Sequence, residues 1–192
     1  HIDAIVAIGG DGTFRGATDM TLRGIPSIGL PGTIDNDITA TDYTIGLDTS
    51  INTVVEMVDC LRDTCESHAR LNVVEVMGRD CGQIALYAAI ATGAVAVAVP
   101  EVPFDEEYAI ERFRHAREIG KRGMIGVFAE GMSLNTEGEK YSENFVKKLE
   151  AETGVECKFA RLAHMVRGGH PTLRDRLTAS RMGVKAVELI VE

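Results

Sequence analysis

The chain has few cysteines and no long apolar run, and each shortage excludes a class of protein. Its four cysteines fit no zinc-binding spacing and no disulfide framework of a secreted domain, so reduced thiols in a cytosol suit them best. No apolar stretch approaches the about 20 residues that a membrane-spanning helix needs, and no secretory signal precedes the first apolar run. The cysteines are Cys60, Cys65, Cys81 and Cys157.

Basic residues are also scarce, with 20 lysines and arginines against 29 aspartates and glutamates, which gives a formal net charge of −9. This balance argues against nucleic acid or an anionic membrane as a general partner, although local basic residues can still bind phosphate groups. The remaining composition, 45% hydrophobic and 26% charged, is ordinary for a globular protein. The 192 residues suit one large domain or two small ones, and we expect a cytoplasmic protein.

Two short loops organise the chain, and each follows an apolar run that is typical of a buried strand. The first, GGDGT at residues 9–13, follows residues 4–8, and the second, PGTIDND at residues 31–37, follows residues 27–30. Residues 14–23 leave room for one short helix between them. Because open α/β sheets bind ligands at the carboxyl ends of their strands, we expect both loops to face one cleft.

The composition of the first loop suits a phosphate group. Its glycines let the backbone approach a ligand closely, and the N–H groups at the start of the following helix suit an anion. Asp11 would repel a bare phosphate, so its natural partner is Mg²⁺ bridging the carboxylate and the phosphate. The same residues can also form an ordinary tight turn, so this motif alone is weak evidence.

The second loop carries the groups that phosphoryl transfer needs. Asp35 and Asp37 flank Asn36, and Thr33 lies just before them. The two carboxylates can provide a general base and a group on the metal side, and the hydroxyl can donate to a transferring phosphoryl group. An Asp-Asn-Asp sequence is also common in simple turns, so the pairing of the two loops carries the argument.

The rest of the chain alternates helical and strand patterns, which predicts parallel sheets. Residues 135–140 are expected to form a polar surface loop. Asp48 and Pro171 are expected to mark helix starts, as an N-cap and a first-turn residue. The expected helices are 49–67, 82–92, 105–120, 142–153 and 171–191, and the expected strands are 71–76, 94–99, 124–129 and 156–162.

These motifs together resemble the 6-phosphofructokinases. GGDGT alone also occurs in NAD kinases and diacylglycerol kinases, but PGTIDND is far more specific, and VMGR at 76–79 and HMVRGG at 164–169 extend the resemblance along essentially the whole chain. The resemblance implies two three-layer α/β/α domains with mainly parallel sheets. Residues 1–46 with 160–192 would form the nucleotide and magnesium side, and residues 47–159 the sugar-phosphate side.

The family's chains are longer than this one. They carry a nucleotide-binding segment before the point where this sequence begins, and a further segment at the C-terminal end. We therefore expect a fragment whose first domain is incomplete, and the missing nucleotide segment argues for inactivity of these 192 residues alone.

The resemblance implies ATP-dependent phosphorylation of fructose 6-phosphate at its 1-hydroxyl. Asp35 would be the general base, with Thr33 and Arg79 stabilising the moving phosphoryl group. Asp11 and Asp37 would hold Mg²⁺. The phosphates of ATP would be cradled by Gly10, Asp11, Gly12 and Thr13.

The same resemblance implies a set of sugar-phosphate ligands. Taken alone, Arg79 would be a surface ion pair, Glu130 a helix cap and His164 a structural residue. In the family, the matching residues contact fructose 6-phosphate, and Arg70 and Lys158 would reach the phosphate held by a neighbouring subunit of a tetramer, although lysine lacks the bidentate fork of arginine. The implied substrate residues are Thr33, Ile34, Asp35, Arg70, Met77, Gly78, Arg79, Glu130, Lys158, His164, Met165, Val166 and Arg167.

Gly12 and Gly32 bear on the choice of phosphoryl donor. Pyrophosphate-dependent relatives commonly carry an aspartate and a lysine at these places, so this chain is similar to the ATP users. Three alternatives stay open: a pyrophosphate-dependent enzyme, a non-catalytic sugar-phosphate-binding fragment or regulatory subunit, and a relative of NAD or lipid kinases.

Overall fold

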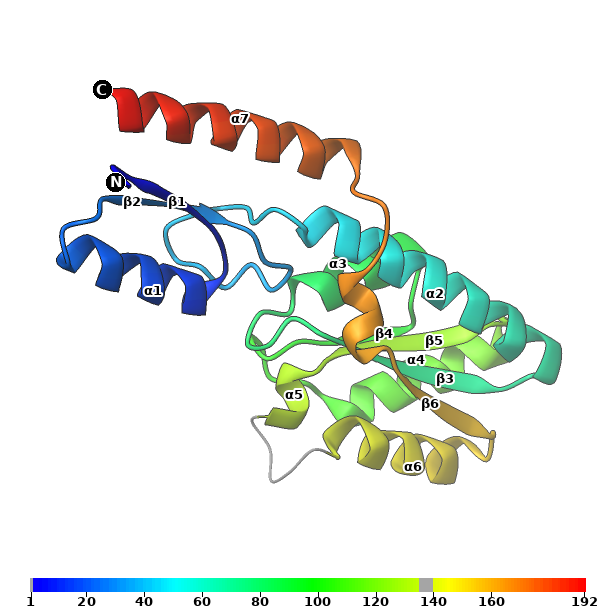
Figure 1. Ribbon diagram of the computed structural model, residues 1–192. Helices are drawn as coiled ribbons and strands as arrows, with labels where there is room; N and C mark the ends of the chain where they lie inside the picture. The colour runs from blue at the N-terminus through cyan, green and yellow to red at the C-terminus, as the bar shows by residue number, and fades with distance from the viewer. Residues whose placement is uncertain (1, 135–139) are drawn as a thin grey trace. The chain divides into compact units, whose positions relative to one another are not determined.

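A computed structural model describes residues 2–134 and 140–192 of the chain, which divides into two compact units (Figure 1). The first unit comprises residues 1–49 and 170–192, and the second comprises residues 50–169. Residues 160–169, which we assigned to the first domain from the sequence, lie in the second unit. Residues 160 and 161 belong to a strand that pairs with the sheet of that unit.

The first unit contains a two-stranded parallel sheet, β1 (Ile5–Gly9) and β2 (Ser27–Pro31), joined by helix α1 (Asp11–Leu22). The strands are in register from Ile5 opposite Ser27 to Gly9 opposite Pro31, so they end side by side. The ring of Phe14 packs α1 against Gly29, where an added Cβ would come within 2.8 Å of Phe14 Cε1. The last helix, α7 (Leu173–Val191), contacts β2.

Three helix starts differ from the expectation by two or more residues. Helix α1 begins at Asp11 because Gly10 takes the extended N-cap conformation, so the glycine-rich loop is itself the helix start. Helix α2 (Leu47–His68) begins one residue before Asp48, which therefore lies in the first turn. In α7, Thr172 is the N-cap and its hydroxyl accepts from the N–H of Asp175 at 3.3 Å, so Pro171 precedes the cap.

The second unit is built on a four-stranded parallel sheet in the order β4-β5-β3-β6, which confirms the predicted α/β class with parallel sheets. Two strands match the prediction to the residue, and β4 is shorter than expected. The strands are β3 (Leu71–Val76), β4 (Ala96–Ala98), β5 (Met124–Ala129) and β6 (Cys157–Arg161), and the other elements are α3 (Gln83–Thr92), α4 (Glu106–Glu118), α5 (Gly131–Leu134), α6 (Tyr141–Thr153) and the 3₁₀ turn η1 (Ala163–Arg167).

Helices cover both faces of this sheet, with α4 and α6 on one side and α2 and α3 on the other (Figure 1). On the first side, Leu71 and Val73 of β3 and Phe128 of β5 form one core cluster with residues of α4 and α6, including Phe113 and Phe145. The rings of Phe128 and Phe145 lie 4.9 Å apart between centroids. Burial of these side chains fixes the strand ends that carry the candidate site.

Two further findings bear on the expectations about membrane spans and cysteines. No helix in the described ranges is long and apolar enough to cross a membrane. All four cysteines are free thiols. The polar loop expected at residues 135–140 falls mostly outside the described residues, and Lys140 is the N-cap of α6.

Candidate active site

The first loop forms the positive end of α1. Gly10 is extended, with φ −94° and ψ −159°, and its carbonyl accepts from the N–H of Phe14 at 3.1 Å. The N–H groups of Asp11, Gly12 and Thr13 are therefore the first donors of a 12-residue helix, where an anion is stabilised. A Cβ at Gly9 would collide with the side chain of Thr13, so this turn requires glycine there.

The two loops lie side by side at the end of the small sheet. The N–H of Gly32 donates to the carbonyl of Gly9 at 3.0 Å. A Cβ added to Gly10 would lie 3.5 Å from Cβ of Thr33. The backbone at the start of α1 and the hydroxyl-bearing residue of the second loop are thus near neighbours, as expected for loops that leave adjacent parallel strands.

The turn of the second loop places Asp35 inward. Asp35 is only 9% exposed, and its N–H donates to Thr33 Oγ1 at 3.4 Å. Asn36 adopts a positive φ of 53°, a conformation that asparagine tolerates better than most residues, and its side chain donates to the carbonyl of Asp42 at 3.5 Å. Ile34 and Asp37 are partly buried.

Asp11 and Asp37 are the acidic residues of this unit that could hold a magnesium ion retaining most of its water. Asp11 Oδ2 lies 2.7 Å from Arg15 Nη2, and both side chains are largely exposed. Residues 2–134 and 140–192 contain no group of three or more His, Cys, Asp or Glu side chains that could hold a metal ion. Mg²⁺ commonly binds through one or two carboxylates together with phosphate oxygens and waters, which is the donor set that Asp11 and Asp37 can offer.

A buried carboxylate holds the segment that follows the second loop. Asp175 of α7 is 2% exposed, and it accepts from the hydroxyl of Tyr43 at 2.5 Å, from the N–H groups of Gly46 and Thr49 at 2.9 Å each, and from the Thr49 hydroxyl. Burial alone would raise the pKa of Asp175, but these hydrogen bonds outweigh it and lower the pKa. Burial, followed by the bond to Asp175, raises the pKa of Tyr43.

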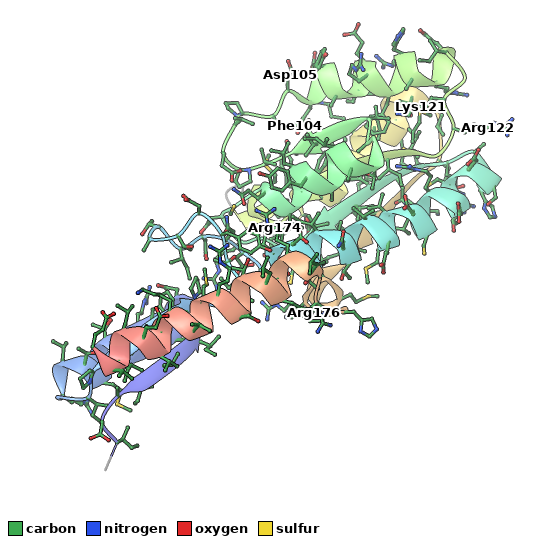
Figure 2. All side chains as sticks on the ribbon, turned by 90° about the horizontal axis from the view of Figure 1, so that it is seen from above. Phe104, Asp105, Lys121, Arg122, Arg174 and Arg176 are labelled. Atoms are coloured by element: carbon green, nitrogen blue, oxygen red, sulfur yellow. The ribbon has the colours of Figure 1, made fainter. Side chains whose placement is uncertain are left out.

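The first turn of α7 also carries two arginines, Arg174 and Arg176, beside that carboxylate in the sequence (Figure 2). The guanidinium carbon of Arg174 lies 4.4 Å from the centroid of the Tyr43 ring. Arg176 Nε donates to the carbonyl of Pro171 at 2.8 Å. Arg176 thus helps to fix the start of α7. Arg174, through Tyr43, connects that start to the chain beyond the second loop.

In the second unit, a cavity of about 220 Å³ lies at the carboxyl ends of β3, β5 and β6. It brings together three of the predicted sugar ligands, Met77, Glu130 and His164. The complete lining is Glu75, Val76, Met77, Glu130, Ser133, Arg161, Ala163 and His164. A pocket at this edge of a parallel sheet is where α/β proteins bind ligands.

Glu130 organises the turn that carries Arg79. Its Oε1 accepts from the N–H of Arg79 at 2.9 Å and from that of Gly78 at 3.3 Å. Gly78 has φ 142°, and a Cβ there would collide with the carbonyl of Cys81, so only glycine fits. Arg79 itself has φ 51° and is exposed. The carboxylate predicted to bind sugar therefore also fixes the backbone of the predicted catalytic arginine.

The segment with His164 and Arg167 is the 3₁₀ turn η1. His164, Met165 and Arg167 are exposed, whereas Val166 is fully buried, so its side chain anchors the turn and cannot face a ligand. The hydroxyl of Thr53 donates to the carbonyl of Gly168 at 2.9 Å and ties the end of the turn to α2.

Arg70 and Lys158 lie at the opposite end of the sheet from this cavity. Arg70 precedes β3, and Lys158 is in register with Asn72 at the start of that strand. Both cations pair with Glu156, Lys158 Nζ at 2.7 Å, and Lys158 and then Arg70 lower the pKa of Glu156. Because a six-residue strand is about 20 Å long, neither cation is grouped with the residues of the cavity.

The sequence reasoning missed Glu75, Ser133 and Arg161 as cavity residues. One signal was available: Glu75 is the single charged residue in LNVVEV, a strand in which every residue is buried. A buried charge needs hydrogen-bonding partners, so a charged residue in such a strand indicates a polar network beside it.

Comparison with known proteins extends these observations. Residues 1–190 match the family model described as Phosphofructokinase. The chain is 50% identical over 191 residues to ATP-dependent 6-phosphofructokinase 1 of Clostridium perfringens, covering 100% of this chain and 58% of that protein. It is 48% identical over 192 residues to ATP-dependent 6-phosphofructokinase of Brevibacillus brevis, with the same coverage of 100% and 58%. The chain thus spans little more than half the length of these relatives.

Solved structures give the same picture. The chain is similar to phosphofructokinase from Saccharomyces cerevisiae, with a TM-score of 0.86 and 35% identity over 98% of this chain and 29% of that one. It is also similar to Pichia pastoris phosphofructokinase in the T-state, with a TM-score of 0.86 and 28% identity over 98% of this chain and 21% of that one. A pyrophosphate-dependent phosphofructokinase from Marinobacter aquaeolei, 24% identical with a TM-score of 0.78 over 99% of this chain and 52% of that one, shares the fold.

Proposed function

Because this chain belongs to the phosphofructokinase family, we propose that the protein containing it transfers the terminal phosphoryl group of ATP to the 1-hydroxyl of fructose 6-phosphate. The products would be fructose 1,6-bisphosphate and ADP. The observation that carries the proposal is the placement of GGDGT and PGTIDND side by side, with Gly10 next to Thr33 and Asp35 turned inward. The names of the similar bacterial proteins support ATP as the donor.

The first unit supplies the groups for the phosphoryl transfer. Asp35 would accept the proton of the 1-hydroxyl as the new oxygen–phosphorus bond forms. Gly10, Asp11, Gly12 and Thr13 would bind the phosphates of ATP through the start of α1. Asp11 and Asp37 would hold Mg²⁺, which when bound neutralises charge on those phosphates. Thr33 would donate a hydrogen bond to the moving phosphoryl group.

The second unit supplies the sugar-phosphate ligands. Met77, Glu130 and His164 line one cavity, and its charged and hydroxyl-bearing side chains suit a hydroxyl-rich ligand. Gly78 and Arg79 follow β3, and Arg79 would neutralise charge on the transferring group. The remaining proposed ligands of the substrate are Ile34 in the first unit and Met165, Val166 and Arg167 in η1, with Val166 restricted to its backbone.

The position of Arg70 and Lys158 supports a role across a subunit interface. Their end of the sheet is about 20 Å from the cavity of their own chain, so a phosphate that they bind belongs to another copy. A cytoplasmic homotetramer is the assembly that we propose. Arg70 and Lys158, which both pair with Glu156, would exchange that carboxylate for the phosphate.

A coupled assay of the complete gene product tests the reaction. Replacement Asp35→Ser removes the base, and we expect kcat to fall by about 10²–10⁴-fold with little change in the KM for fructose 6-phosphate. Asp19→Asn, on the exposed face of α1, is the matched control and should behave like the unchanged protein. Near-normal turnover of the Asp35→Ser protein would exclude this residue as the base.

The same assay with pyrophosphate in place of ATP tests the donor. Gly12 has no atom within 4 Å of an added Cβ, so its lack of a side chain leaves space beside the helix start. At Gly32, an added Cβ would lie 3.1 Å from Ile8 Cγ2 and 3.5 Å from the N of Gly9, so a lysine there would press on the first loop. Turnover with pyrophosphate but not with ATP would contradict the proposal. Assaying the isolated 192-residue chain beside the complete product separates a catalytic from a binding fragment.

A further inference from the structure

A buried carboxylate joins three elements around the sugar cavity. Glu75 is the penultimate residue of β3, and it is 3% exposed. Its Oε2 accepts from the hydroxyls of Ser133 in α5 at 3.0 Å and Ser142 in α6 at 2.6 Å, and its Oε1 accepts from Arg161 Nε at 2.6 Å. These three hydrogen bonds fix the Glu75 carboxylate and the side chains that donate to it.

Arg161 is the partner that faces the cavity. It ends β6 directly opposite Glu75 in the parallel ladder, and its side chain is 41% exposed. Its guanidinium carbon lies 5.4 Å from the centroid of the Phe159 ring, and its Nη2 lies 3.6 Å from Glu143. These contacts, together with the bond from Nε to Glu75, fix the plane of the guanidinium group at the rim of the pocket.

We propose that Arg161, oriented by Glu75, is a specificity-determining residue that donates a hydrogen bond to a ring hydroxyl of the phosphosugar. The inference rests on the proposed function, because the cavity also contains Met77, Glu130 and His164. Glu75 acts as a positioning residue: it sets the guanidinium plane and does not itself need to touch the ligand.

The charges around the cavity favour a hydroxyl over the phosphate as the acceptor. The positive charge of Arg161 is balanced by Glu75 and by the nearby Glu143, and the lining also contains Glu130. A phosphate beside these carboxylates would be repelled, whereas a neutral hydroxyl gains a fixed donor without that cost. Ser133 links the same network to the turn after Glu130, since its N–H donates to the Glu130 carbonyl at 2.9 Å.

Calorimetric titration of the complete gene product tests this inference without requiring turnover. The ligands are fructose 6-phosphate and its epimers tagatose 6-phosphate and psicose 6-phosphate, which keep the phosphate and each invert one hydroxyl. For Arg161→Met we expect the Kd of fructose 6-phosphate to rise about tenfold, equivalent to about 1.4 kcal/mol, and its preference over at least one epimer to fall by a similar factor.

Two further variants keep the outcome interpretable. The double variant Glu75→Gln/Arg161→Met leaves no unpaired buried carboxylate, and it should show the same loss of preference if the single variant does not fold. Arg114→Met is the matched control, because Arg114 also pairs with a glutamate, Glu152 at 2.6 Å, but does not line the cavity.

Two results would overturn the inference. One is an unchanged Kd in a folded Arg161 variant. The other is an equal rise for all three sugars, which would place Arg161 on the shared phosphate. If the unchanged protein binds fructose 6-phosphate but does not phosphorylate it, the proposed function fails while the role of Arg161 can still be measured.

Discussion

Removing the Asp175 carboxylate should destabilise the first unit more than any surface charge change. Asp175 is 2% exposed and accepts four hydrogen bonds, from Tyr43, from Gly46 and from both the N–H and the hydroxyl of Thr49. Asp175→Ala would leave these donors buried without their acceptor. Breaking a buried charged network typically costs about 3–5 kcal/mol, so we expect a loss in the free energy of unfolding of about 3 kcal/mol or more.

For a chain of this size, such a loss lowers Tm by roughly 6–12 °C at about 2–4 °C per kcal/mol. Asp175→Asn keeps the shape of the side chain but places an amide N–H₂ group against hydrogen-bond donors. We expect it to lower the free energy of unfolding by about half as much as Asp175→Ala. Urea and thermal unfolding followed by circular dichroism measure both variants. Asp63→Asn, an exposed aspartate of α2, is the control and should change the stability by less than about 0.5 kcal/mol.

The pH dependence provides a second check on the same carboxylate. Because folding lowers the pKa of Asp175, its contribution is fully present above about pH 4, the pKa in the unfolded chain, and is lost as the pH falls through the lower folded value. The stability difference between the unchanged protein and Asp175→Asn should therefore shrink in strong acid. A difference below about 1 kcal/mol at pH 7, or one that persists undiminished at pH 2, would refute this account.

Two other substitutions test separate parts of the candidate site. Gly78→Ala should raise the KM for fructose 6-phosphate and lower kcat together, because a Cβ would collide with the carbonyl of Cys81 and displace the Arg79 turn. Unchanged kinetics would contradict the assigned geometry. Gly154→Ala is the control for backbone strain alone, because Gly154 also has a positive φ but no atom lies within 4 Å of the added Cβ. Glu156→Gln should tighten the binding of fructose 6-phosphate at low salt, because it frees Arg70 and Lys158 to bind phosphate. The gain in affinity should fade as salt is added. Unchanged or weaker binding at low salt would count against the proposed role of these cations.

Much of the framework could be predicted because it depends on local patterns. Strands β3 and β5 are mainly apolar runs bounded by turn residues, and both match the prediction to the residue. The closeness of the two loops followed from their positions after neighbouring parallel strands. The starts of α1 and α7 were displaced because capping by Gly10 and Thr172 depends on backbone conformation that composition alone does not fix.

The parts that could not be predicted involve residues that are distant in the sequence. Nothing local links Asp175 to Tyr43, 132 positions away. Glu75 stood out only as a charge in an apolar strand, and its partners Ser133 and Arg161 come from elements 58 and 86 positions further along. Such networks form when tertiary packing removes water from the polar groups.

Under the proposed reaction, Glu130 would link sugar recognition to the position of Arg79. Its Oε1 already accepts from the backbone N–H groups of Gly78 and Arg79, so a sugar hydroxyl that donates to this carboxylate would bind the same side chain that holds the turn of the arginine. A ligand whose hydroxyl shifts the Glu130 carboxylate would also shift the Gly78–Arg79 turn. A ligand that lacks this hydroxyl would leave Arg79 in its present position. Under the proposed reaction, the protein would thus sense the correct sugar through its own main chain before any phosphoryl group moves.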